Sequence, residues 1–233
     1  MRQCGAMKTP PYRRRARRTH EVLLAKYGTP VWRNPLPPLD ELVSTILSQN
    51  TNDINRDRAY AALRARFPTW EAVRDAPTAA VVDAIRAAGL ANQKGPRIQQ
   101  ALHTITAERG ALELDFLRGR PRAEVRAWLL SINGVGPKTA AIVMQFSLDM
   151  PAFAVDTHVH RITGRLGLRP PEMSADATHA HMENLLPPEA YGAAHLNLIR
   201  LGREVCHARR PACPNCPLRR LCQYYKNGGA INA

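Results

Sequence analysis

Acidic residues are scarce in this chain of 233 residues, which has 19 Asp and Glu against 33 Lys and Arg. The formal net charge of +14 favours a polyanionic partner, of which nucleic acid is the leading candidate. The sequence also lacks an apolar run of about 18 residues and a basic amphipathic helix with an aromatic face. We therefore expect no membrane partner.

Two further features are missing. The N-terminus has no apolar segment typical of a signal peptide, so we expect a protein of the bacterial or archaeal cytoplasm or nucleoid, where thiols stay reduced. No convincing alternation of apolar and polar residues indicates a β-strand, whereas apolar residues recur at helical spacing. With 45% hydrophobic residues the chain can form a core, and we expect an all-α protein that is monomeric.

The N-terminal residues 1–18 contain an arginine-rich run and little to bury. We expect a basic flexible tail that either keeps the protein soluble or contacts DNA, with Cys4 as a free thiol. Beyond it, helical patterns and N-cap residues predict helices from about residue 19, after Asp156, and at 39–48, 52–67, 69–74, 78–88, 96–109, 122–132, 137–147, 174–186 and 188–206.

The chain is organised around residues 127–146, where two helical patterns meet at Gly134-Val135-Gly136. Glycines on both sides of Val135 allow the backbone to turn through positive φ. The N–H groups that open the second helix are suited to bind a phosphate. Lys138 lies in that first turn, where the helix dipole disfavours its ammonium form and favours a nucleophilic amine. The alternative is an ordinary turn followed by a solvated lysine.

Four of the five cysteines lie within seventeen residues near the C-terminus, with the spacing C-x6-C-x2-C-x5-C: Cys206, Cys213, Cys216 and Cys222. Thiolate ligands suit structural zinc or an iron–sulfur cluster, and this spacing favours a 4Fe-4S cluster without excluding zinc. Arg209 and Arg210 lie inside this loop. They are candidate phosphate contacts, or the ordinary solvated charge of an exposed loop.

Three stretches together resemble the endonuclease III family of DNA glycosylases, within the helix-hairpin-helix superfamily: residues 132–140, residues 155–159 and the cysteine loop. The resemblance covers roughly residues 20–225. It implies two all-α lobes with a DNA cleft between them. One would be a six-helix barrel at 31–150, and the other an iron–sulfur domain built from 19–30 and 151–233. It also implies that the four cysteines hold a 4Fe-4S cluster.

The same resemblance implies an activity. In the family the hairpin lysine attacks C1′ of a flipped-out nucleotide and a nearby aspartate assists, and Lys138 and Asp156 match these positions. The expected function is base excision repair by a bifunctional DNA glycosylase and AP lyase acting on duplex DNA. It would remove oxidised pyrimidines of the thymine glycol type through a Schiff base and cut 3′ to the abasic site by β-elimination. Asp156 is also placed to cap the following helix.

The residues that fill the space of the flipped base depart from the family pattern. Asn50 stands where the family commonly has a glutamine, with Gln49 one residue before it. Leu90 is either the wedge of a second loop or a core leucine that ends a helix. Ala91 replaces a larger aromatic side chain, so we expect a plug of smaller volume.

Three rival functions remain open. An adenine-mismatch glycosylase would lack the hairpin lysine and carry a glutamate near the position of Thr45. A thymine-mismatch glycosylase of the same fold is the second rival, and a non-catalytic iron–sulfur DNA-binding protein is the third.

His158 and His160 form an H-x-H pair that we expect to hydrogen-bond or face DNA rather than bind a metal.

Overall fold

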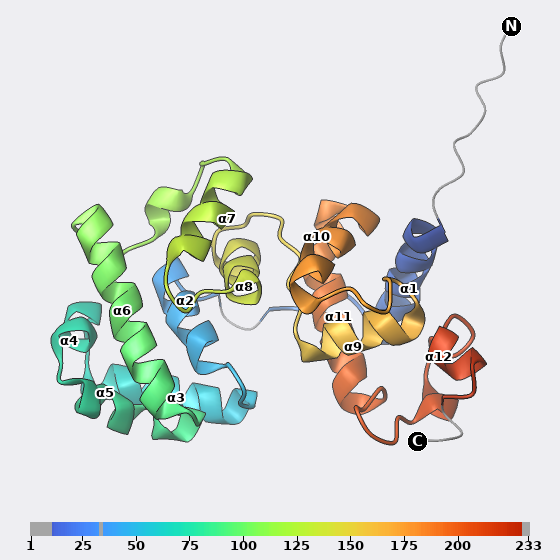
Figure 1. Ribbon diagram of the computed structural model, residues 1–233, viewed down its shortest axis with the longest axis horizontal. Helices are drawn as coiled ribbons and strands as arrows, with labels where there is room; N and C mark the ends of the chain where they lie inside the picture. The colour runs from blue at the N-terminus through green and yellow to red at the C-terminus, as the bar shows by residue number, and fades with distance from the viewer. Residues whose placement is uncertain (1–10, 33–34, 230–233) are drawn as a thin grey trace, which may run out of the picture. The chain divides into compact units, whose positions relative to one another are not determined.

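The computed structural model describes residues 11–32 and 35–229 (Figure 1). Every regular element in these ranges is a helix, which confirms the expected all-α fold. The chain divides into two compact units. The hairpin unit is Trp32–Met150, and the cysteine unit comprises the described parts of Met1–Val31 and Pro151–Ala233. No helix in the described ranges is long and apolar enough to cross a membrane.

The described part of the hairpin unit contains seven α-helices and two short 3-10 helices: α2 (Pro38–Leu47), α3 (Asp53–Arg66), α4 (Trp70–Asp75), α5 (Thr78–Ala84), η1 (Arg86–Ala88), α6 (Ala91–Arg109), η2 (Asp115–Leu117), α7 (Arg122–Ser131) and α8 (Pro137–Ser147).

Helix α2 lies at the centre of this unit. All of its residues except Asp40 are buried, and it packs against α3, α6 and α8 (Figure 1). Helix α8 is also largely enclosed, because Ala140–Met144 form a continuous buried run. Two adjacent buried helices hold each other in place, so the C-terminal end of α2 and the first turn of α8 are fixed by the core.

The described part of the cysteine unit contains α1 (Pro11–Tyr27), α9 (Thr157–Leu166), α10 (Ala175–Leu185), η3 (Pro188–Ala190), α11 (Tyr191–Glu204), η4 (Cys213–Asn215) and α12 (Gln223–Lys226). Its core brings together Leu23 of α1, Ile162 of α9 and Leu198 of α11, with Phe153 from the segment before α9. The N-terminal helix is therefore an integral part of this unit.

Helix α1 corrects the prediction of a flexible tail through residue 18. The helix begins at Pro11, not near residue 19. Ala16, Thr19 and Leu23 are buried at spacings of three and four residues, which gives the helix one packed face. The tail prediction is therefore wrong for residues 11–18, while Cys4 and the other residues of 1–10 lie outside the described ranges.

Two arginines of the basic run make contacts that explain this helix. Arg13 donates to the carbonyl of Asn184 at 2.9 and 3.2 Å, near the end of α10. Arg15 donates to the carbonyl of Gly167 at 2.9 Å, just past the end of α9. Helix C-termini attract cations, so part of the basic run stabilises the fold.

Helix α6 differs from its prediction at the N-terminus. It begins at Ala91, and Pro96 lies inside it instead of opening it. The carbonyl of Leu90 accepts from the amides of Gln93 at 2.9 Å and Lys94 at 3.0 Å, so the helix is already formed before the proline. Since Pro96 lacks only one N–H, it removes a single hydrogen bond from this helix.

Most remaining boundaries follow the predictions closely, and α8 has the predicted bounds. The exceptions are two helices that tighten into 3-10 turns. The predicted helix at 78–88 is α5 followed by η1, and the predicted helix at 188–206 is η3 followed by α11.

Candidate active site

The hairpin between α7 and α8 uses its two glycines differently. Gly134 has φ of 86°, the left-handed conformation that favours glycine. Gly136 has φ −94° and ψ 177°, ordinary extended backbone at the N-cap of α8, so the expected turn through positive φ is found at Gly134 and not at Gly136. Val135 is buried and its amide donates to the carbonyl of Ile132 at 3.0 Å. DNA contacts here would therefore come from the hairpin backbone.

The N-terminus of α8 has no side-chain cap. Gly136 has no side chain to cap with, and the next residue, Pro137, has no N–H. First-turn N–H groups of a helix have no partner within the helix, so this end is electrostatically suited to an anion. The side chain of Arg97 lies beside the hairpin, since a Cβ on Gly134 would meet it at 3.4 Å. The sequence does not identify Arg97 as a site residue, because no motif surrounds it.

Lys138 lies in the first turn of α8 and is half-buried. Its Nζ donates to Ser48 Oγ at 3.2 Å, and that hydroxyl donates to the carbonyl of Thr45 at 2.7 Å. Ser48 is the C-cap of α2. The amine is thus oriented by a hydroxyl that the end of a buried helix holds in place, and no sequence pattern singles out Ser48.

Asp156 is the N-cap of α9, as predicted. Its Oδ1 accepts from the amide of Val159 at 2.8 Å, and its backbone is extended at φ −105°. The preceding residues 152–155 are buried, which fixes the approach of the chain to the helix. This geometry fixes the carboxylate and confirms the capping role, and the catalytic role stays a prediction.

His158 lies on the first turn of α9 and packs into the cysteine unit. Its Nδ1 accepts from Arg161 Nη2 at 3.1 Å, and a Cβ added to Gly202 of α11 would lie 2.5 Å from the same atom. Burial lowers the pKa of this histidine, so its neutral form is favoured. His160 Nε2 is within 3.0 Å of the carbonyl of Met173. These contacts account for both imidazoles within the fold, and a DNA contact by His158 stays a prediction.

The predicted plug residues lie on two turns of the hairpin unit. Asn50 is exposed with φ of 52°, and Leu90 is 47% exposed with φ of 51°. The alternative of a core leucine is therefore wrong. A left-handed backbone costs a residue with a Cβ about 1–2 kcal/mol, and such strain is common where function requires it. Gln49 is half-buried, and its Oε1 is 3.5 Å from Arg97 Nη1.

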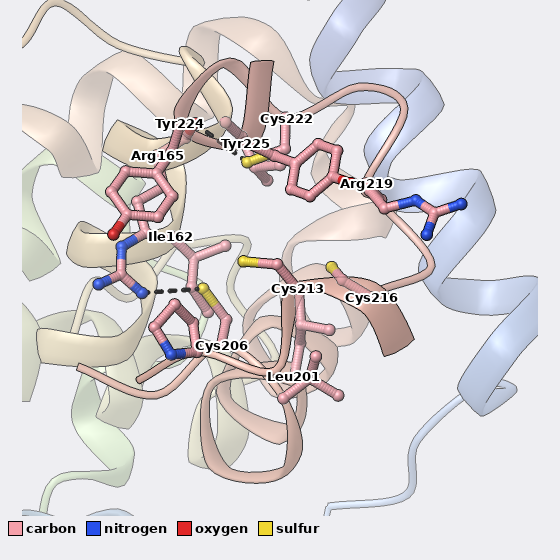
Figure 2. A pocket seen from close by; sticks show the side chains of 13 residues that line it. Ile162, Arg165, Leu201, Cys206, Cys213, Cys216, Arg219, Cys222, Tyr224 and Tyr225 are labelled. Carbon is pink, nitrogen blue, oxygen red and sulfur yellow. Dashed lines mark hydrogen bonds between the residues drawn. The ribbon is translucent and has the colours of Figure 1, made fainter. Parts of the chain in front are cut away.

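The four predicted cluster ligands line one pocket of the cysteine unit: Cys206, Cys213, Cys216 and Cys222. All four are free thiols, and Figure 2 shows their sulfurs around a common space. The pocket is also lined by Ile162, Arg165 and Leu201, from α9 and α11. Arg165 Nη1 contacts Cys206 Sγ at 3.3 Å and the carbonyl of His207 at 2.6 Å, which ties the loop to α9.

The chemistry of this donor set fits a group that binds thiolates. Burial raises the pKa of the Cys213 and Cys222 thiols, and it raises the pKa of Cys216 to about 11. Thiols of this kind deprotonate readily only when a metal supplies the compensating charge. Within the described residues no three potential ligands lie close enough together to share one metal ion. The identity of a group bound by these thiols therefore stays a prediction.

Arg209 and Arg210 are exposed on the loop that joins the first two cysteines, and Arg210 has φ of 48°. Arg165 Nη2 donates to the carbonyl of Ala208 at 2.9 Å, directly before them. The two guanidinium groups are thus presented on a loop anchored by α9. Their role as phosphate contacts stays a prediction.

Comparison with known proteins gives the family context of this geometry. A model described as "HhH-GPD superfamily base excision DNA repair protein" matches residues 43–188. Endonuclease III of Thermotoga maritima is 34% identical over 195 residues, which cover 82% of this chain and 85% of that protein. A protein of Arabidopsis thaliana named "putative DNA glycosylase" is 42% identical over 151 residues, or 65% of this chain. The matched region spans only about half, 52%, of that plant protein.

Comparison with solved structures gives the same family context. A trapped covalent intermediate of endonuclease III with DNA superposes with a TM-score of 0.79 at 28% identity, covering 95% of this chain and 99% of that chain. A thermostable thymine-DNA glycosylase superposes with a TM-score of 0.77 at 22% identity, covering 92% and 98%, which establishes a shared fold alone.

Proposed function

The chain belongs to the HhH-GPD superfamily of base excision DNA repair proteins, within its endonuclease III family, and on that premise we propose that it is a bifunctional DNA glycosylase and AP lyase. Its substrate class would be duplex DNA containing oxidised pyrimidines of the thymine glycol type or abasic sites.

The observation that carries this proposal is the position of Lys138. An amine in the first turn of α8 is next to uncapped N–H groups suited to a backbone phosphate. Ser48 accepts a hydrogen bond from Nζ and so directs the amine. A phosphate held beside an oriented amine would bring the C1′ of a flipped nucleotide within reach of a nucleophile.

The proposed reaction begins with attack of neutral Lys138 Nζ on C1′. The C1′–N bond to the base breaks, and the base leaves with the electron pair and gains the first proton that Nζ loses. The C1′–O4′ bond then breaks, O4′ gains the second proton of Nζ, and a Schiff base remains between Nζ and C1′. Loss of a C2′ proton allows β-elimination, in which the bond from C3′ to its phosphate oxygen breaks. Hydrolysis of the imine returns the free amine.

Asp156 would stabilise the positive charge that develops on the sugar as the base departs. The hydrogen bond to Val159 fixes Oδ1 at the start of α9, so the carboxylate needs little reorganisation when that charge appears. Capping and catalysis then depend on the same orientation of one side chain.

Selection of the lesion would occur when the base leaves the helix stack. The phosphate contacts are the same for any sequence, whereas a damaged or weakly stacked base costs less to flip. The exposed side chains of Asn50 and Leu90 are suited to enter the space that the base leaves. Asn50 is shorter than the glutamine common in the family, and Ala91 next to Leu90 is smaller than the usual aromatic residue, which favours poorly stacked lesions.

The cysteine pocket would hold a 4Fe-4S cluster through Cys206, Cys213, Cys216 and Cys222. When bound, the cluster supplies folding energy for the loop. In this way it would keep Arg209 and Arg210 positioned for phosphate contacts. No step of the base removal depends on it.

Trapping with borohydride on a duplex that contains one abasic site tests the proposal. Wild type should form a covalent adduct, and Lys138→Ala should form none while binding the duplex with similar affinity, because arginines and backbone amides supply most phosphate contacts. Lys26→Ala is the matched control, since it truncates an exposed lysine of α1 in the same way. A Lys138→Ala variant that still traps would place the nucleophile elsewhere.

Excision from a panel of duplexes separates the rival functions. Thymine glycol should be removed faster than thymine opposite guanine or adenine opposite 8-oxoguanine. Faster removal of the mismatched thymine would make the chain a mismatch glycosylase. An adenine-mismatch enzyme is disfavoured because Lys138 is present and Thr45 stands near the position where such an enzyme would carry a glutamate. Binding without any excision or trapping would leave a non-catalytic DNA-binding protein.

A further inference from the structure

Lys94 is among the largest fully buried side chains in the described part of the protein, with 1% of its surface exposed. Its Nζ donates to two backbone carbonyls, those of Leu47 and Ala88, each at 2.8 Å. Burial of an ammonium is costly, and it lowers the pKa of this lysine to about 8. A lysine retained under these conditions needs an explanation in its contacts.

The two carbonyls belong to segments far apart in the sequence. Leu47 is the last residue of α2, and the turn that follows carries Gln49 and Asn50. Ala88 is the last residue of η1, and the turn that follows carries Leu90. Carbonyls at helix ends have no partner within their own helix. One buried ammonium satisfies a carbonyl at the base of each turn.

Both turns carry an exposed side chain on a left-handed backbone. Asn50 has φ of 52° and Leu90 has φ of 51°; asparagine adopts this conformation readily, whereas for leucine it is strained. A strained backbone such as that of Leu90 persists only where surrounding contacts over-determine it. Lys94 also donates its backbone amide to the carbonyl of Leu90 at 3.0 Å, so it holds the second turn from two directions.

We infer that Lys94 is a positioning residue that locks the Asn50 turn and the Leu90 turn together as one rigid DNA-inserting unit. The inference rests on the proposed function. The spacing of the two exposed side chains is then fixed before DNA binds, and their ordering entropy is not lost during insertion. Lys94 acts at base extrusion and has no part in the chemistry at C1′.

Gln99 provides a matched control on the same helix. It is 7% exposed, and its Nε2 donates to the carbonyls of Val73, Arg74 and Ala76 at 3.0, 3.2 and 2.7 Å. Like Lys94, it is a buried donor of α6 that ties loop carbonyls to the core. Unlike Lys94, it holds the connection between α4 and α5, which carries neither Asn50 nor Leu90.

The experiment compares Lys94→Met with Gln99→Met in the full chain. Single-turnover rates are measured for excision of thymine glycol, which requires base extrusion, and for cleavage at a preformed abasic site, where no base must leave the stack. Lys94→Met should lower the ratio of the first rate to the second at least tenfold. Gln99→Met should lose thermal stability but keep the ratio within about twofold of wild type.

Coupling to Leu90 gives a second readout. In a Leu90→Ala background, Lys94→Met should reduce excision far less than it does alone, because the turn it holds has lost its wedge. Should Lys94→Met fail to fold, Lys94→Gln retains one buried donor group and should lower the same ratio by a smaller factor.

An unchanged ratio in a folded Lys94 variant, or an equal loss of both rates, would overturn the inference and leave Lys94 as a residue of general stability. That result differs from failure of the proposed function, in which wild type itself would neither excise thymine glycol nor cleave the abasic site.

Discussion

Substitution of Asp156 separates its two roles most clearly. Asp156→Asn keeps an oxygen that can accept from the amide of Val159, and asparagine caps helices about as well as aspartate. Only the interaction of the charge with the helix dipole is lost, about 0.5 kcal/mol. Asp156→Ala removes the cap as well and should cost about 1 kcal/mol of stability, which lowers the Tm by roughly 3 °C.

The effect on excision should be much larger than either stability change. A carboxylate that stabilises developing charge contributes on the order of a hundredfold in rate, or about 2.7 kcal/mol of the barrier. Single-turnover excision should therefore fall about equally in Asp156→Asn and Asp156→Ala, although their thermal stabilities differ.

Ser174→Ala is the control for lost capping. Ser174 is the N-cap of α10 in the same unit, and its hydroxyl accepts from the amide of Ala177 at 3.1 Å. This variant should lose about 1 kcal/mol of stability and retain wild-type excision. Normal excision by Asp156→Asn, or an equal loss of excision in Ser174→Ala, would refute the catalytic role and leave Asp156 as a cap.

Three more side chains have contacts from which the effect of a substitution can be predicted and measured. Ser48→Ala removes the hydroxyl that accepts from Lys138 Nζ, so trapping at an abasic site should slow several-fold while duplex affinity, measured by fluorescence anisotropy, is unchanged. Cys213→Ser should abolish the broad visible absorbance of an iron–sulfur cluster and lower the Tm. The control variant Cys4→Ser should change neither the absorbance nor the Tm. Stoichiometric zinc without iron in the purified wild-type protein would contradict the cluster assignment. Burial lowers the pKa of Lys94 from 10.5 to about 8 in the folded state, so above pH 8 the unfolded state binds more protons and the free energy of unfolding should rise with pH. In denaturant titrations between pH 8 and 9.5, wild type should gain roughly 1.5 kcal/mol of stability relative to Lys94→Met. A stability difference between wild type and Lys94→Met that falls over this range would refute the burial of the ammonium.

Local rules are sufficient for the parts of the site where one residue decides the structure. Asp156 before an apolar helical pattern predicts an N-cap, and Pro137 after a glycine turn predicts the start of α8. The four-cysteine spacing likewise predicts one shared pocket. Each of these signals depends on neighbours within a few residues, so the sequence displays it directly.

Long-range contacts explain what the sequence does not reveal. Arg15 favours a helical N-terminus because it reaches the carbonyl of Gly167, more than a hundred residues away. Lys94 resembles any charged residue near a helix start, and only the fold brings the carbonyls of Leu47 and Ala88 to its ammonium. The predicted start of α6 is too late because Pro96 is typical of a first helical turn, although the left-handed Leu90 already caps the helix.

Mapping of the residue that forms the borohydride adduct tests the central claim most directly. After trapping on an abasic duplex, nuclease treatment and tryptic digestion, mass spectrometry should find the sugar remnant on a peptide of residues 127–161, because modification of Lys138 prevents cleavage after it. Unmodified protein should give residues 127–138 and 139–161 as separate peptides. A remnant on the N-terminal amine or on any other lysine, with residues 127–138 released intact, would contradict the assignment of Lys138 as the nucleophile.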